Sequence, residues 1–98
     1  MSKYEIPIID EPRQSLGTIL GGQSVHITLA WQPSDKHWYL GMKWRDGRDI
    51  LAGVRLIAGA NLAEGARHEF NGAIQVEGNG NPGRTAWRDE THRLVFIP

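Results

Sequence analysis

The side chains that most often bind metal ions or catalyse reactions are spread singly along this chain of 98 residues. Zinc sites and metalloprotease motifs place two ligands within about five residues of each other. No two histidines here are that close, because they are His26, His37, His68 and His92. We therefore expect no metal site and no bound cofactor.

Candidate nucleophiles and acids are equally isolated. Cysteine is absent, which excludes a disulfide framework, a thiolate zinc site and a cysteine nucleophile. No serine lies in a Gly-x-Ser-x-Gly elbow, and the glycine-rich stretch Gly78–Gly83 lacks the Lys-Ser/Thr of a phosphate-binding loop. Asp35 and Asp46 are explained as loop and turn residues. The sequence predicts no catalytic residue and a protein that is not an enzyme.

Tryptophan is the residue type that offers a binding chemistry. Trp31, Trp38 and Trp44 could stack on bases or sugars, with Lys43 and Arg45 near enough for phosphate. The same three indoles share their register with apolar residues of their own segments, which favours a place in the core. Two interpretations follow: a packed core, or a small β-barrel that binds nucleic acid or carbohydrate through exposed tryptophan.

The fourth tryptophan, Trp87, lies outside any periodic pattern, so it either covers the core or anchors a partner. It belongs to the long segment 78–92, which is rich in glycine and asparagine. A loop of this length in a compact domain is usually either mobile or functional. We predict that this segment contacts a partner and that the partner-binding residues are Trp87, Arg88 and Arg84.

Alternation of apolar and polar residues indicates the strands that would carry these side chains. Two long runs, Val25–Trp31 and Trp38–Trp44, alternate at every second position. The segment Gln32–Lys36 joins them, so we expect an antiparallel hairpin.

A third strand is predicted within Arg48–Ile57. The dipeptide Asp46-Gly47 precedes it and predicts a two-residue type I′ turn, which needs positive φ at both residues. Gly53 interrupts the alternation of this strand and predicts a bulge.

The remaining runs complete an all-β pattern. Asn61–Ala66 indicates one or two helical turns, with Asn61 as N-cap. Shorter strands are predicted at Tyr4–Ile9, Ser15–Leu20, Ala73–Glu77 and Arg93–Ile97. Short turns between about six to seven strands indicate an antiparallel β-sandwich or partly closed barrel, forming a single domain over residues 1–98.

Charge and hydropathy restrict the classes of partner. Eleven basic residues balance eleven acidic ones, so no net field attracts nucleic acid or an acidic membrane. No apolar run approaches the length of a membrane span, and Met1–Glu5 does not lead into a signal-peptide stretch. We expect a soluble protein made in the cytosol that binds neither nucleic acid nor a membrane.

The order of these features along nearly the whole chain resembles a known family. The similarity begins with Tyr4-Glu5-Ile6-Pro7-Ile8, the Leu20-Gly21-Gly22-Gln23 turn and the strand ending at Trp31. It continues through Trp38-Tyr39-Leu40, the Asp46-Gly47 turn and the segment Gly53–Leu62, and it ends with Gly72–Val76 and Leu94-Val95-Phe96. Together they resemble the small baseplate plug proteins of contractile-tailed phages, typified by a cyanophage baseplate plug.

This resemblance implies an all-β, non-enzymatic structural protein of the virion. It implies a place in the tail baseplate near the central hub, after synthesis in the cytoplasm of the host. The implied partners are other baseplate and tail proteins, namely the hub and the tube-initiating proteins, together with a possible symmetric homo-oligomer. In such an assembly, binding to neighbours would raise the stability of a small subunit without disulfides.

Overall fold

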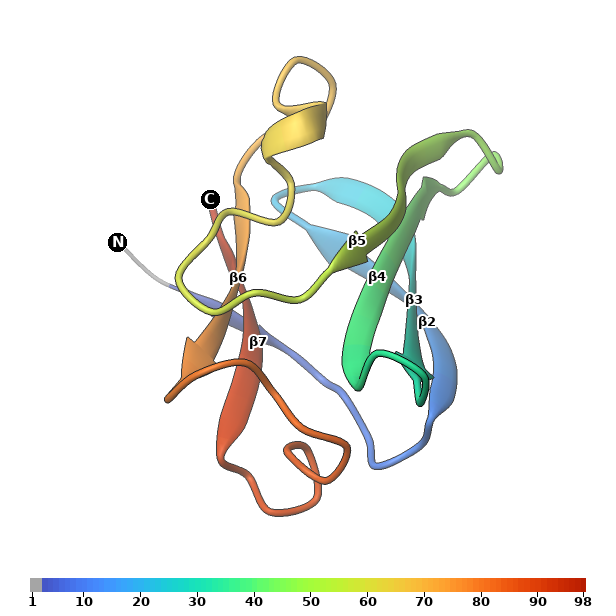
Figure 1. The fold of residues 1–98 in the computed structure, drawn as a ribbon. Coiled ribbons are helices and arrows are strands. Elements are labelled where there is room, and N and C mark those ends of the chain that lie inside the picture. Colours follow the sequence, from blue (N-terminus) through green and yellow to red (C-terminus); the bar gives the residue numbers. More distant parts are fainter. Residues whose placement is uncertain (1–2) are drawn as a thin grey trace.

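The computed structural model describes residues 3–98 and places them in two antiparallel β-sheets (Figure 1). One sheet has the strand order β2-β3-β4-β5 and the other has the order β1-β7-β6. The elements are β1 Tyr4–Ile6, β2 Arg13–Leu20, β3 Gln23–Gln32, β4 His37–Trp44, β5 Asp49–Arg55, the 3₁₀ turn η1 Glu64–Ala66, β6 Ala73–Gly78 and β7 His92–Ile97. The predicted all-β sandwich with a short helical turn is confirmed.

The four-stranded sheet consists of consecutive hairpins. β3 alternates as predicted, with Val25, Ile27 and Leu29 buried and the residues between them facing outward. β3 and β4 pair without interruption as far as Gln32, which lies opposite His37. The predicted hairpin between them is confirmed.

The turn between β4 and β5 differs from the prediction. Of the two turn residues, Gly47 alone has a positive φ, at 96°, so this is not a type I′ turn. The N–H of Gly47 donates to the carbonyl of Trp44 at 2.9 Å, and the N–H of Trp44 donates to the carbonyl of Arg48 at 2.8 Å. These bonds enclose three residues, as in a type I turn followed by a left-handed glycine. The Oδ1 atom of Asp46 accepts the N–H of Arg48 at 3.1 Å, which keeps Asp46 in its ordinary backbone region.

The predicted bulge in β5 is confirmed. Leu40 pairs with Val54 and Met42 pairs with Leu51, so β5 contains one residue more than β4 over this stretch. Gly53 lies in the extra segment and has a φ of 73°, which a residue with a side chain rarely adopts. The bulge makes this edge of the sheet irregular.

The three-stranded sheet brings the two ends of the chain together (Figure 1). β7 is the central strand, and Phe96 lies opposite Tyr4 on one side and Ile74 on the other. β1 ends at Ile6, three residues before the predicted limit at Ile9. Pro7 follows it without an N–H to donate to a ladder, and the chain then crosses to the other sheet.

Asn61 is not the N-cap of a helix, contrary to the prediction. The helical segment is the 3₁₀ turn η1, and its N-cap is Ala63, without a side-chain capping bond. The Oδ1 atom of Asn61 instead accepts the N–H groups of Ala63, at 3.0 Å, and of Ile74, at 3.1 Å. The second bond comes from β6, so Asn61 ties this segment to the three-stranded sheet.

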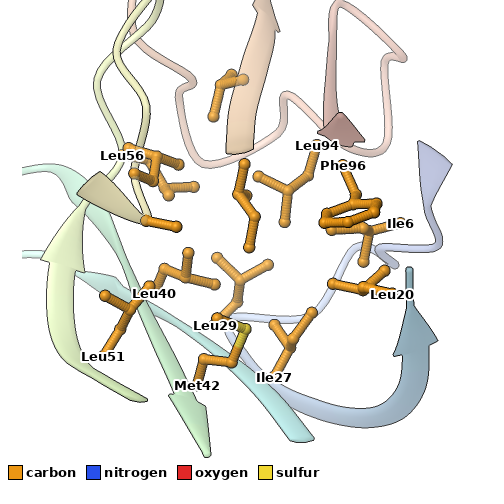
Figure 2. Close-up of a cluster of buried hydrophobic side chains, with 14 of the residues drawn as sticks. Ile6, Leu20, Ile27, Leu29, Leu40, Met42, Leu51, Leu56, Leu94 and Phe96 are labelled. Carbon is orange, nitrogen blue, oxygen red and sulfur yellow. The ribbon is translucent and has the colours of Figure 1, made fainter. Parts of the chain in front are cut away.

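The core lies between the two sheets (Figure 2). Large apolar side chains from both sheets point toward one another there, and the fully buried ones include Ile6, Leu20, Ile27, Leu29, Leu40, Met42, Leu56, Ile74 and Leu94. Phe70 and Phe96 extend this core as an edge-to-face pair with ring centres 5.8 Å apart. Apolar burial of this kind is the main favourable term in folding.

Carboxylates at the surface that are paired in the folded chain make its stability sensitive to acid. A hydrogen bond from Lys3 lowers the pKa of Glu77, and the backbone N–H of Arg48 lowers that of Asp46. Because the folded pKa values lie below the unfolded ones, the contribution is complete above about pH 5 and is lost as the pH falls through the folded values. We expect the urea midpoint of unfolding to fall between pH 5 and pH 3, and to fall less at high salt. A midpoint that stays constant or rises over this range would contradict the assignment.

Candidate functional site

The loop over residues 79–91, between β6 and β7, is the longest connection between two strands of one sheet, and it is folded (Figure 1). The N–H of Asp89 donates to the carbonyl of Thr85 at 3.0 Å, and the N–H of Thr91 donates to that of Ala86 at 3.1 Å. The Nε2 atom of His92 lies 2.9 Å from the carbonyl oxygen of Gly80 and closes the base of the loop. The loop therefore presents a defined surface.

The side chain of Trp87 points inward and packs this loop against the core. Its side chain is 8% exposed, and its ring packs edge-on against that of Trp38, with centres 5.7 Å apart. Trp38 is fully buried, and its Nε1 donates to the carbonyl of Gly83 in the same loop at 2.8 Å. The Nε1 of Trp87 is buried without an acceptor among residues 3–98. Of the two roles open to Trp87, covering the core is the one that these contacts perform in the free chain.

Arg84 ties the loop to the segment before β2. Its Nη1 lies 2.9 Å from the Oδ1 of Asp10, and its guanidinium lies over the ring of Trp38 at 5.8 Å. A cation over an indole face is attracted by the electrons of the ring. Arg84 thus has internal partners on two sides.

Arg88 is the most exposed of the three residues predicted to bind a partner. Its side chain is 62% exposed, and its Nε donates to the Oδ1 of Asp89 at 3.1 Å. The hydroxyl of Thr85 donates to the other carboxylate oxygen at 3.0 Å. These bonds, first that of Arg88 and then that of Thr85, lower the pKa of Asp89, so the pair stays charged at neutral pH. The terminal nitrogens of Arg88 have no hydrogen-bond partner within the described chain.

A hollow of about 450 Å³ adjoins the loop. Trp87 and Arg88 form part of its wall, whereas Arg84 does not. Its other lining residues are Glu5, Ile6, Ile8, Glu90, His92, Arg93 and Leu94. Its lining combines acidic and basic side chains with a few apolar ones, which suits a polar contact with another protein more than the binding of a single ion.

The tryptophans do not form a stacking platform. Trp38 is buried, while Trp31 and Trp44 are half-buried and pack against the core. Trp31 packs edge-on against Trp38 at 5.5 Å, and Trp44 packs against Phe70 at 6.3 Å. Trp38 and Trp44 are six positions apart along β4, a distance of about 20 Å. The geometry therefore favours the packed core over the nucleic-acid or carbohydrate module.

Over residues 3–98, no three histidine, aspartate or glutamate side chains come together in a way that could hold a metal ion. No helix in this part of the chain is long and apolar enough to cross a membrane.

Sequence reasoning missed the contacts that fix the loop. Asp10 and the indole nitrogen of Trp38 reach it from distant segments, and no local pattern marks either residue as a partner. Glu90 has a φ of 56°, which is uncommon for a residue with a side chain. It lines the hollow and forms no ion pair with any of residues 3–98. The Arg-Asp-Glu run at positions 88–90 forms a charged rim on the loop, and it is the sequence signal from which this rim could have been predicted.

The chain matches a known protein family. A family model described as cyanophage baseplate Pam3 plug gp18 matches residues 3–98. No curated protein matches the chain.

Proposed function

Because the chain belongs to the cyanophage baseplate plug family, and its role is therefore a structural one in the tail baseplate, we propose that it closes the baseplate beside the central hub. In this proposal it acts through shape and contact area and catalyses no reaction. The family match over residues 3–98 is the observation that supports it most strongly.

The proposed partners are the hub and the tube-initiating proteins of the same particle. The 79–91 loop is the proposed contact, because it is a folded projection with a charged rim and a hollow beside it. Specific interfaces combine such an ordered polar rim with a small number of anchoring residues. Assembly of several copies around the tail axis is part of the same proposal, as is synthesis in the host cytoplasm.

The three predicted partner-binding residues take different parts in this proposal. Arg88 makes the direct contact, since its terminal nitrogens have no acceptor among the described residues. They can therefore donate two parallel hydrogen bonds to one carboxylate of the partner. Trp87 forms the adjoining wall of the hollow and fixes the loop to the core. Arg84 fixes the position of the loop through its ion pair with Asp10, in the segment before β2.

Reversing the charge of Arg88 tests the contact. Arg88→Glu should weaken association with the hub and tube-initiating proteins by about five- to tenfold, because an interfacial cation becomes an anion. Arg67→Glu is the matched control, since Arg67 is 61% exposed and also pairs with one neighbouring carboxylate, that of Glu64. Co-elution of the purified proteins, with the dissociation constant from titration, measures the effect.

Equal behaviour of the two variants would remove Arg88 from the interface. Failure of the unchanged chain to associate with any of these proteins, together with its absence from purified particles, would overturn the proposed function itself.

A further inference from the structure

The sandwich has four sheet edges, and three of them are protected against pairing with another chain. β1 is only three residues long, and β5 is interrupted by the bulge at Gly53. The edge of β6 is blocked at Ile74, which donates to the side chain of Asn61 and accepts the N–H of Leu62 at 2.7 Å. Short strands, bulges and covering loops are the usual ways in which proteins block their edges.

The edge of β2 has none of these protections. β2 extends over Arg13–Leu20 and pairs only with β3, in an unbroken register. After Arg13 it contains no charged residue, no proline and no bulge. Charged residues, proline and bulges are what discourage strand addition at an edge. β2 is thus the open edge of this molecule (Figure 1).

The register shows which backbone groups of β2 are free. Leu20 and Gln23 flank the two-residue turn Gly21-Gly22, so they form a hydrogen-bonded pair. Because bonding alternates along an antiparallel strand, Thr18, Leu16 and Gln14 also bond to β3. The N–H and carbonyl groups of the intervening residues therefore point away from the sheet, and these residues are Arg13, Ser15, Gly17 and Ile19.

Unpaired positive charge lies at both ends of this edge. Arg13 begins β2, and Arg45 lines a hollow of about 240 Å³ together with Ile19 and His26. Both arginines are exposed, and neither forms an ion pair with any residue of the range 3–98. A strand that paired with β2 would therefore lie near two guanidinium groups that lack a carboxylate, with Arg45 reaching toward it from across β3.

An apolar hollow continues the same surface. Ile19 is 65% exposed and Tyr4 is 45% exposed, and both line a hollow of about 300 Å³ with Phe96 and Pro98. An incoming strand could place an apolar side chain here while its backbone pairs with β2. Pairing of backbones with pockets for side chains is the usual form of recognition by strand addition.

From these features we infer that β2 receives an extended acidic segment of a different protein as a fifth strand of its sheet. A second copy of this chain fits less well. Antiparallel pairing of two β2 strands over their full length would place Arg13 of one copy opposite Ile19 of the other, and so near Arg45 of that copy. Like charges in this position repel. The inference uses the proposed function only to locate the partner in the baseplate, and it does not depend on the 79–91 loop.

Hydrogen exchange of the free chain and of assembled baseplates tests this directly. We expect the outward amides of Arg13, Ser15, Gly17 and Ile19 to exchange at least about tenfold more slowly in the baseplate, because their free N–H groups become bonded. Unchanged exchange of residues 13–20 in baseplates that contain the chain would overturn the inference. Slowed exchange in 79–91 alone would do so while leaving the proposed function intact.

Variants at Ser15 distinguish the contribution of its backbone N–H to binding from that of its side chain. Ser15→Pro removes one outward N–H, a change that an edge strand tolerates, whereas Ser15→Ala keeps it. Incorporation into baseplates should fall at least about tenfold for the proline variant and stay unchanged for the alanine variant. Equal incorporation of the proline and alanine variants would overturn the inference. A dimer of the free chain that Ser15→Pro dissociates would also overturn it, because the strand paired with β2 would then come from a second copy.

A charge variant covers the case in which the proline variant fails to fold. Arg13→Glu combined with Arg45→Glu alters no backbone bond and should reduce incorporation by a similar factor. The loss should be greater at low salt, because screening weakens exposed charges. Incorporation equal to that of the unchanged chain would contradict the acidic character of the partner.

Discussion

Replacing Trp38 with alanine should lower the free energy of unfolding by about 3–5 kcal/mol, the usual cost of removing a large aromatic side chain from a core. Trp38 is fully buried and contacts two other indoles, those of Trp31 and Trp87. Its Nε1 also donates to the carbonyl of Gly83, so the variant loses a bond from the sheet to the 79–91 loop. Urea denaturation followed by far-UV circular dichroism measures the change.

Two further variants separate packing from the hydrogen bond. Trp38→Phe keeps an apolar ring but cannot donate to Gly83, so amides of the loop should exchange faster than in the unchanged chain. Trp31→Ala is the matched control on the opposite strand, and because Trp31 is only half-buried it should cost less than Trp38→Ala. A decrease in the free energy of unfolding below about 1 kcal/mol for Trp38→Ala would contradict the conclusion that packing around Trp38 stabilises the core.

Gly72→Ala should cost about 2–6 kcal/mol, for two reasons that add. Gly72 has a φ of 109°, a backbone conformation that alanine adopts only with strain of about 1–3 kcal/mol. A Cβ atom there would lie 2.5 Å from the Cε1 of Phe96 and 2.9 Å from the backbone oxygen of Ile97. The backbone of Ile97 belongs to β7, so it cannot move aside without breaking the sheet, and overpacking adds about 1–3 kcal/mol.

Gly80→Ala is the control for this prediction. Gly80 also has a positive φ, of 76°, but a Cβ atom there would meet nothing within 4 Å. It should therefore show the cost of the backbone conformation alone, about 1–2 kcal/mol. Thermal or urea unfolding of both variants gives the comparison, and equal losses would show that the contacts with Phe96 and Ile97 are not limiting.

Local sequence patterns were sufficient to predict most of the strands. The alternation around Val25–Trp31 and Trp38–Trp44 has the period of a strand with one buried face, and a short loop between them leaves antiparallel pairing as the simple solution. Gly53 was identified as a bulge for the same local reason, since it breaks the alternation. These features depend on residues that are neighbours in the chain.

Features that depend on distant residues could not be predicted in this way. Asn61 has the sequence features of an N-cap, but its side-chain oxygen accepts a hydrogen bond from the N–H of Ile74 in β6. The Asp46-Gly47 pair is compatible with more than one hairpin turn, and the hydrogen bond that the N–H of Arg48 donates to the carboxylate of Asp46 accompanies the three-residue form. Tertiary contacts of this kind override local preferences.

The role of segment 78–92 as a partner contact stays a prediction, whereas its folded conformation is seen in the structure. The length and composition of segment 78–92 marked it as a surface for contact, and the structure shows that it projects as a folded loop. The sequence could not show that Trp87 is held against Trp38, or that Arg84 is occupied by Asp10, because these partners lie 49 and 74 positions away in the chain. The open edge of β2 depends on which strands pair, so it was also beyond the reach of sequence patterns.

A reconstruction of the purified tail baseplate by electron cryo-microscopy tests the central claim most directly. If the chain closes the baseplate as proposed, its density lies beside the central hub, with the 79–91 loop against another protein and Arg88 in the contact. Baseplates that are complete and able to contract without this chain, or particles in which it is absent by mass spectrometry, would contradict it.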